Sequence, residues 1–479
     1  MLFNTFQYLG FFVFVFAAAW LLAGFPRLRI WFLLAASFYF YASNNGWQIL
    51  LILLTVTIDY LVCRGLERTD GDGARRRLVT VSILSNLGML AWFKYSNFLG
   101  DGISHLAALV GIKLGWVTLN VMLPIGISFY TFEALSYTID VYRRKIPAER
   151  NWNRLAFLVS FFPHLIAGPI VRAADFFPQM RRPPRLTRDD LEWAVFKITG
   201  GLIKKIVFAD GIAPLAEAAF DHPSALGTVR VWLGVYAFAL EIYFDFSGYT
   251  DIALGSARLL GFQLPENFRR PYAATSITDF WHRWHMTLST WLRDYLYIPL
   301  GGNRMKTRWG VYRNLMLTML LGGLWHGAAW TFVFWGGLHG AYLTIERALG
   351  VGRLPATMRR PAWLAPIQGL LVFHLVLLTW IPFRARSIPQ MRRILASMFS
   401  ASVGPGLTGG EIAAALIIGG ALLWQQAGER FSFKELVLRI PGPSKALTYS
   451  FVAAAVLFTA MVHFWGAPEV PKTFIYFRF

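Results

Sequence analysis

One histidine lies in a setting that favours acid–base chemistry. His326 occupies the segment LGGLWHGAAW (residues 321–330), which holds no acidic or basic neighbour. An imidazole buried among apolar groups stays neutral, and the neutral form is the one that accepts a proton as a general base. A histidine in such a segment is more often a packed, hydrogen-bonded group than a catalyst, so both interpretations stay open from the residues alone.

Two other histidines have the spacing of residues on one helix face. His282 and His285 lie three residues apart, and residues at that spacing share a face. The spacing suits a metal ion, but no third ligand lies nearby and Arg283 between them would oppose a cation. We therefore expect no metal and instead a polar network, with His285 inside and His282 nearer a membrane interface.

Two aspartates lie in an otherwise apolar helix. The segment YFDFSGYTD (residues 243–251) carries Asp245 and Asp251 with Ser247 between them, and Glu241 lies one turn earlier. Buried acids of this kind relay protons in some transporters. They can equally pair with the arginines of the following segment and stabilise the fold, and we favour that interpretation.

The composition identifies the environment that must position these groups. The chain has 479 residues, of which 56% are hydrophobic and only 15% charged, whereas soluble domains carry about 25% charged residues. A soluble enzyme is therefore excluded. The single cysteine, Cys63, excludes an internal disulfide and a multi-cysteine zinc site. The net charge of +20 comes from short basic runs between apolar segments, a pattern typical of cytoplasmic loops near anionic lipids rather than of nucleic-acid binding.

Apolar stretches long enough to cross or enter a bilayer recur along the chain. The first, residues 6–24, is followed at once by Arg27 and Arg29, which predicts a retained anchor with the N-terminus outside. The others are residues 30–43, 47–62, 78–93, 103–118, 121–140, 155–171, 198–220, 230–257, 314–347, 364–383, 411–427 and 446–465.

Two of the regions do not fit simple crossings. Residues 155–171 have basic loops on both sides, so either Pro163, Gly168 and Pro169 make the segment re-entrant or the positive-inside rule fails there. Residues 258–313 interleave arginines with tryptophans and tyrosines, which predicts amphipathic or re-entrant helices at an interface.

Residues 314–347 predict one helix that carries His326. Gly323 and Gly327 are four residues apart, as are Gly336 and Gly340, and this spacing lets another helix or a substrate approach the backbone closely. On a continuous helix His339 would face away from His326, so we expect it to be a packing residue. The whole chain, residues 1–479, is expected to form a single all-α membrane domain.

Three strings in the interfacial region carry a resemblance to a known family. They are NFRRPY (267–272), SITDFWHRWHMTLS (276–289) and WLRDYLYIPLGGNR (291–304). With DFSGYTD (245–251) and LWHG (324–327), they closely resemble the membrane-bound O-acyltransferase family, and within it the members that acetylate bacterial exopolysaccharides such as alginate. The resemblance runs from about residue 30 to 385 and includes FIYFRF at 474–479.

The resemblance implies a fold and a set of functional residues. It implies an all-α polytopic membrane protein, a ring of about 11–13 transmembrane and re-entrant helices around a central funnel and tunnel. His326 would be the catalytic histidine and His285 a second functional histidine. Only these two positions are taken from the resemblance; six others are our own expectation for residues that line the substrate tunnel or support it: Trp325, Asp245, Ser247, His282, Arg283 and Asn303.

The resemblance also implies a reaction and its partners. Without a tightly bound cofactor, acetyl-coenzyme A or an acylated carrier protein would donate an acyl group from the cytoplasm. The acceptor would be a hydroxyl of an alginate-like or cellulose-like exopolysaccharide outside a bacterial inner membrane, reached through a periplasmic acetyltransferase-type protein. The N-terminus would be periplasmic, membrane lipids would surround the protein, and no nucleic acid would bind.

Alternatives remain open for the reaction and for one tyrosine. Within the family, D-alanyl transfer to teichoic acid is an alternative, and a proton-coupled multi-pass transporter is an alternative of another class. Tyr476 is either an acyl relay or an aromatic anchor in the interfacial belt, and we favour the anchor.

Overall fold

The computed structural model describes most of the chain and is helical throughout. It describes residues 1–479 apart from 44–45, 114, 117, 120–121, 352–363, 405, 428–473 and 475–479. All regular elements in the described part are helices. Three are long and apolar enough to cross a bilayer, Gly46–Glu67, Asp72–Leu109 and Leu364–Arg384, and Phe6–Leu21 is a shorter apolar helix. The chain is thus an all-α polytopic membrane protein, as predicted, whereas the predicted span at 446–465 lies outside the described residues.

The helices form two compact units. One comprises Met1–Ile198 with Thr250–Pro265, and the other comprises Thr199–Tyr249 with Glu266–Phe479. Two of the three boundaries fall inside helices α10 (Arg188–Leu202) and α12 (Thr228–Leu259), and the third lies between Pro265 and Glu266. The ring, the funnel and the single domain over residues 1–479 stay predictions.

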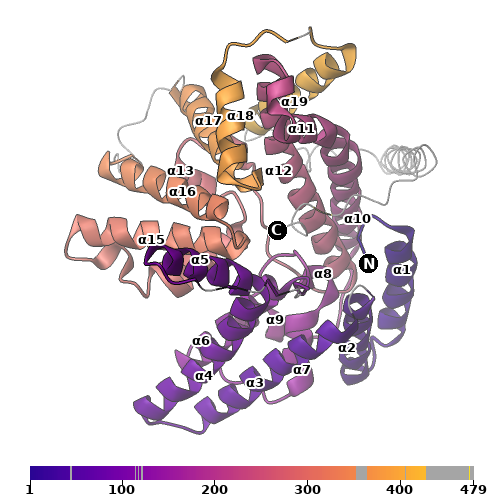
Figure 1. Ribbon diagram of the computed structural model, residues 1–479. Coiled ribbons are helices and arrows are strands. Elements are labelled where there is room, and N and C mark those ends of the chain that lie inside the picture. Colours follow the sequence, from indigo (N-terminus) through magenta and orange to yellow (C-terminus); the bar gives the residue numbers. More distant parts are fainter. Residues whose placement is uncertain are drawn as a thin grey trace. The chain divides into compact units, whose positions relative to one another are not determined.

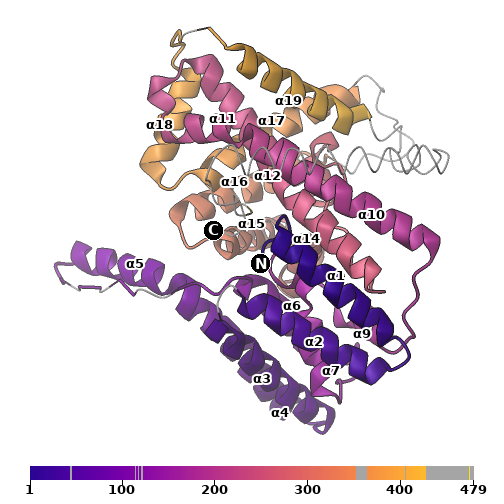
Figure 2. The ribbon, with the colours of Figure 1, turned by 90° about the vertical axis from the view of Figure 1, so that its right-hand side faces the viewer.

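The first unit is built around a buried helix. Helices α3 (Ile49–Glu67) and α4 (Asp72–Leu90) lie side by side (Figure 1), and both pack on α6 (Ile127–Tyr142), which is buried along most of its length. Helices α1 (Phe6–Leu21) and α2 (Pro26–Ala42) also lie side by side (Figure 2). Helix α5 spans Ser96–Leu109. Thr5 caps α1 by accepting a hydrogen bond from the Tyr8 backbone N–H.

The segment 155–171 is broken, as its prolines and glycine predict. Helix α7 (Trp152–Ser160) ends before Pro163, and the four-residue α8 (Phe162–Leu165) follows it. An irregular stretch then leads to α9 (Ala173–Met180). A Cβ on Gly168 would lie 2.3 Å from the Cα of His164, so the chain doubles back at a point where only glycine fits. Its depth in a membrane stays a prediction.

The second unit carries most of the residues singled out by the sequence. After α10, a π-helical segment Ile203–Ala209 leads into α11 (Asp210–Asp221), and α12 follows. Between Leu259 and Arg308 the helical segments are short, and they include α13 (Ile277–Trp281), α14 (Met286–Leu292) and a π-helical segment, Arg293–Tyr297. Helices α15 (Arg308–His326), α16 (Trp330–Ala348), α17 (Leu364–Arg384), α18 (Ile388–Phe399) and α19 (Gly409–Ala427) complete it. Its core includes Trp284, Trp335 and Trp380, all nearly inaccessible.

The predicted single helix over 314–347 is wrong, because the chain turns back within it. Helix α15 ends at His326, Gly327 is extended (φ −163°, ψ 148°), and α16 returns alongside α15 (Figure 1). Gly323 and Gly336 make this approach possible, since a Cβ on either would lie 2.3 Å from a backbone oxygen of the other helix. The glycines therefore bring two helices of one hairpin together.

Candidate active site

His326 lies at the turn of the α15–α16 hairpin. It is the last residue of α15, and its side chain is 5% exposed. Its ring centroid lies 5.0 Å from that of Trp325, 5.1 Å from that of Trp335 and 5.2 Å from that of Phe383. The hairpin and α17 thus place the imidazole in an aromatic pocket with little access to water.

His285 lies in the turn between α13 and α14. Its backbone is left-handed (φ 42°, ψ 53°), and its side chain is fully buried. The Asn267 carbonyl accepts from the Met286 N–H at 2.9 Å, and the Asn267 side chain accepts from the Thr287 hydroxyl at 2.6 Å. These bonds hold the turn. Burial lowers the pKa of His285 to about 3, so its imidazole is neutral at physiological pH.

The two predicted site histidines contact the same indole. The Trp325 ring lies 6.0 Å from the ring of His285 and 5.0 Å from that of His326. The ring of His285 also lies 4.8 Å from that of Phe246 on α12. Segments distant in sequence are thereby brought together around Trp325.

His282 and His285 do not share a helix face, which corrects the sequence prediction. His282 is the residue after α13, exposed on the wall of a cavity, whereas His285 is buried at the start of α14. The left-handed turn between the short helices separates them. The predicted difference in burial is confirmed. Arg283, which lies between the two histidines in the sequence, forms an ion pair with Asp279 at 2.8 Å.

Both aspartates are ion-paired, as the structural interpretation predicts. Asp245 pairs with Lys205 at 2.6 Å, and Lys205 also pairs with Asp210 at 2.9 Å. Asp251 pairs with Lys197 at 2.8 Å. Lys197 lies on α10 and Lys205 on its π-helical continuation, in the segment that precedes α12. The structural interpretation of these acids is supported by these lysine pairs.

Two other predicted residues lie in different surroundings. Ser247 is buried beside Phe246, and within the described part of the chain its hydroxyl has no hydrogen-bond partner. Asn303 lines the cavity and accepts a hydrogen bond from the Tyr297 hydroxyl at 2.9 Å. Tyr476 lies outside the described residues. Phe474, which is described, packs 4.8 Å from the ring of Tyr249.

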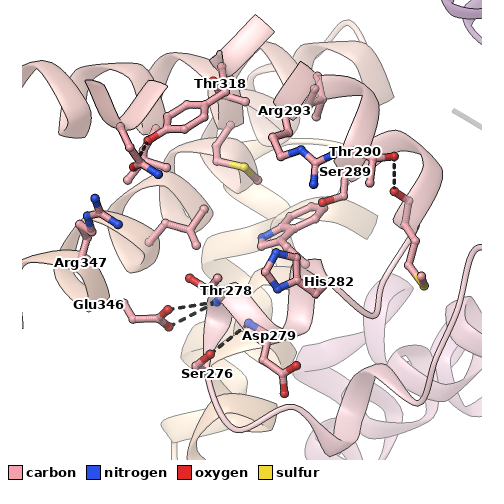
Figure 3. A pocket seen from close by; sticks show the side chains of 18 of the residues that line it. Ser276, Thr278, Asp279, His282, Ser289, Thr290, Arg293, Thr318, Glu346 and Arg347 are labelled. Atoms are coloured by element: carbon pink, nitrogen blue, oxygen red, sulfur yellow. Dashed lines mark hydrogen bonds between the residues drawn. The ribbon is translucent and has the colours of Figure 1, made fainter. Parts of the chain in front are cut away.

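A cavity of about 690 Å³ lies among α13, α14, α15 and α16. Much of its lining is polar (Figure 3): Ser276, Thr278, Asp279, His282, Ser289, Thr290, Arg293, Thr318, Glu346 and Arg347. Glu346 points to the start of α13 and accepts from the backbone N–H groups of Ile277 at 2.6 Å and Thr278 at 3.2 Å. Only His282 and Asn303 of this lining were predicted. Arg293 lay in a recognised string, whereas nothing local marked Glu346 or Arg347.

Aromatic rings separate this cavity from His326. Trp281 and Met319 line the cavity, and His326 is not among the described residues that line it. The ring of Trp281 lies 5.8 Å from that of Trp335, which in turn contacts His326. One indole thus lies at the cavity wall and the next lies against the imidazole.

Two further buried histidines have polar partners. His339 is buried, and its Nε2 lies 3.0 Å from the Thr379 hydroxyl, as befits the predicted packing residue. In the first unit, Nδ1 of His164 lies 3.0 Å from Glu133. Within the described ranges, no group of three or more histidine, cysteine or acidic side chains is placed to hold a metal ion.

Most of the chain is similar in sequence to known proteins. The sequence model of the MBOAT, or membrane-bound O-acyltransferase, family matches residues 36–385. The probable alginate O-acetylase AlgI of Azotobacter vinelandii is 45% identical over 384 residues, covering 78% of this chain and 73% of the relative. AlgI of Pseudomonas aeruginosa is 42% identical, covering 84% and 75%. The peptidoglycan O-acetyltransferase of Helicobacter pylori is 35% identical, covering 78% and 74%.

The match to the family model includes His285, His326 and the whole α15–α16 hairpin. The predicted enzyme class is confirmed, and the protein is an O-acyltransferase. The chain belongs to the membrane-bound O-acyltransferase family.

Proposed function

We propose that this protein moves an acetyl group from a cytoplasmic thioester to a hydroxyl on the far side of a bacterial inner membrane. The final acceptor is an exopolysaccharide of the alginate or cellulose type, reached through a periplasmic acetyltransferase-type partner. The observation that carries the proposal is the placement of His326 at the hairpin turn, against Trp325, which also contacts His285. The relatives described as alginate O-acetylases support the polysaccharide acceptor.

In the proposed reaction His326 acts as the general base. It takes the proton of the acceptor hydroxyl while that oxygen attacks the thioester carbonyl. The carbon–sulfur bond then breaks, and the leaving thiolate receives the proton from His326. General-base assistance of this kind contributes on the order of 10²–10⁴-fold. His285, neutral at pH 7, orients the acceptor or stabilises the oxyanion.

The cavity beside α13 is the proposed entry for the donor. Its volume of about 690 Å³ lies in the range of small-molecule sites. Guanidinium groups such as those of Arg293 and Arg347 bind phosphates well, and phosphates occur in coenzyme A and in the arm of a carrier protein. The acyl end reaches His326 past Trp281 and Met319, so the proposal requires these side chains to move when the donor binds.

Placing the reaction within the membrane solves a transport problem. Coenzyme A carries several charges and does not cross hydrocarbon. In this proposal the donor reaches His326 from one side of the membrane and the acceptor reaches it from the other. Only the acetyl group then crosses the membrane. No tightly bound cofactor is needed, because the thioester supplies the activated acyl group. The N-terminus is periplasmic in this proposal, and Tyr476 remains an interfacial anchor.

Sealed proteoliposomes with donor and acceptor in different compartments test the proposal. We expect acetyl transfer to an oligosaccharide inside the vesicle when an acetyl thioester is added outside to correctly oriented protein. Parallel reactions with acetyl-coenzyme A, an acetylated carrier protein and a D-alanylated carrier protein identify the donor. Consumption only of the D-alanyl donor would replace acetylation with teichoic-acid chemistry. Ion-coupled flux without thioester consumption would favour a transporter.

A further inference from the structure

Among the described residues of the second unit, three buried indole groups have no hydrogen-bond acceptor. The Nε1 atoms of Trp281, Trp335 and Trp380 are all inaccessible, and none has a hydrogen-bond partner in the part of the chain that the structure describes. An indole N–H is a donor only, and buried tryptophans usually satisfy it. A buried donor without an acceptor costs folding free energy, so each such group in a native protein calls for an explanation.

Only one of these three indoles is in contact with His326. The ring of Trp335 lies 5.1 Å from the imidazole in an edge-to-face arrangement. Trp281 contacts Trp335 at 5.8 Å and lies at the cavity wall. Trp380 lies 5.3 Å from Phe383 and 6.4 Å from Trp335. The unsatisfied donor of Trp335 is therefore the one nearest the proposed base.

Trp335 is also held rigidly. The next residue, Gly336, packs so closely on α15 that a Cβ there would lie 2.3 Å from the Met319 carbonyl oxygen. On its other sides the indole meets His339 at 4.8 Å and Phe383 at 5.3 Å. A donor fixed in this way needs no reorganisation during a reaction, which is the property required of a group that stabilises a transition state.

The proposed reaction creates a charge that needs such a donor. When the acceptor oxygen bonds to the thioester carbon, the carbonyl electrons move to its oxygen and form an oxyanion. The His326 ring contacts the rings of Trp325, Trp335 and Phe383. In this low-dielectric pocket a single N–H donor has a large effect.

We propose that the indole N–H of Trp335 donates a hydrogen bond to the oxyanion of the tetrahedral intermediate. Trp335 is thus a catalytic residue, and its unsatisfied donor is kept for the reaction. The acceptor proton resides on His326 while the oxyanion exists. As the carbonyl re-forms, the carbon–sulfur bond breaks and the thiolate takes that proton. This inference rests on the proposed function, with His326 as the base.

A Trp335 variant that loses the indole N–H but keeps an aromatic ring tests the inference. In Trp335→Phe we expect kcat for acetyl transfer to fall about 10²–10³-fold, the loss typical of one oxyanion donor, with KM for the thioester nearly unchanged. Trp380→Phe is the matched control. Trp335 and Trp380 are each 1% exposed, and both have an unsatisfied N–H, but the Trp380 indole packs on Phe383 rather than on His326. We expect Trp380→Phe to stay within about threefold of the parent.

An isosteric variant separates chemistry from packing. Benzothienylalanine at position 335 replaces the indole N–H with sulfur and keeps the ring shape, so kcat should fall as in Trp335→Phe while the unfolding temperature is unchanged. If this variant keeps the parent kcat, or if Trp335→Phe and Trp380→Phe lose equal activity, the inference is overturned. His326→Ala is measured alongside. Full activity in that variant overturns the proposed function, whereas its inactivity beside a fully active Trp335→Phe overturns only the role of Trp335.

Discussion

The close contact between α15 and α16 makes a prediction about two neighbouring glycines. A Cβ on Gly336 would lie 2.3 Å from the Met319 carbonyl oxygen, well inside van der Waals contact. A Cβ on Gly337 would meet only the Leu320 side chain, at 3.7 Å, which is an ordinary contact. Both glycines lie within α16, where alanine is intrinsically favoured by about 0.5–1 kcal/mol. The two alanine variants should therefore have opposite effects.

We expect Gly336→Ala to destabilise the protein and Gly337→Ala to leave it unchanged or slightly more stable. Overpacking of this kind costs about 1–3 kcal/mol, which exceeds the helix-propensity gain. The helices must also separate by roughly 1 Å, and a displacement of that size at a reacting centre costs about 10²-fold in rate. Because α15 carries His326 and α16 carries Trp335, Gly336→Ala should lose activity even when it is folded.

Two measurements on detergent-purified protein check this prediction. Thermal unfolding gives the stability of each variant, and acetyl transfer from a thioester, measured well below the unfolding temperature, gives its activity. A Gly336→Ala variant as stable and as active as Gly337→Ala would refute the reasoning, since it would mean that the helices do not approach as closely as the structure places them.

Three other predictions follow from the ion pairs, the buried imidazole and the cavity. Lys205→Met leaves the carboxylates of Asp210 and Asp245 without their shared cation, so it should cost about 3–5 kcal/mol in unfolding experiments, and adding Asp245→Asn should recover part of this loss. Burial lowers the pKa of His285 to about 3 from 6.5, so the unfolded chain binds this proton more tightly and stability should fall as the pH drops below 6.5. His285→Asn, which tolerates the left-handed backbone, should lose less unfolding temperature between pH 7 and pH 5 than the parent. Arg293→Ala should raise KM for the thioester about tenfold with a smaller effect on kcat, since it removes the proposed phosphate contact at a partly exposed site.

The sequence predicted the elements whose signals are local. The strings at 276–304 and around His326 identify the family, and apolar stretches such as 30–43 and 364–383 correspond closely to α2 and α17. The break at residues 155–171 was predicted from Pro163, because a proline removes a donor and obstructs the preceding turn.

The sequence did not predict the turn after His326 or the contacts between distant segments. An apolar run with glycines fits a long helix and a tight hairpin equally well, so Gly327 did not reveal the turn after His326. The length of 314–347, well beyond the roughly 20 residues that span a bilayer, was the available signal. The pairing of Asp245 with Lys205, and the approach of Glu346 to Ile277, depend on tertiary packing that no local pattern encodes.

The rate of acetyl transfer by His326→Ala tests the account most directly. The variant is compared with the parent and with His374→Ala, whose imidazole bonds to Tyr236 on α12 at 2.6 Å rather than contacting the aromatic pocket. We predict that single-turnover acetyl transfer by the folded protein falls about 10²-fold or more in His326→Ala and stays near the parent rate in His374→Ala. Transfer by folded His326→Ala at the parent rate would contradict the account.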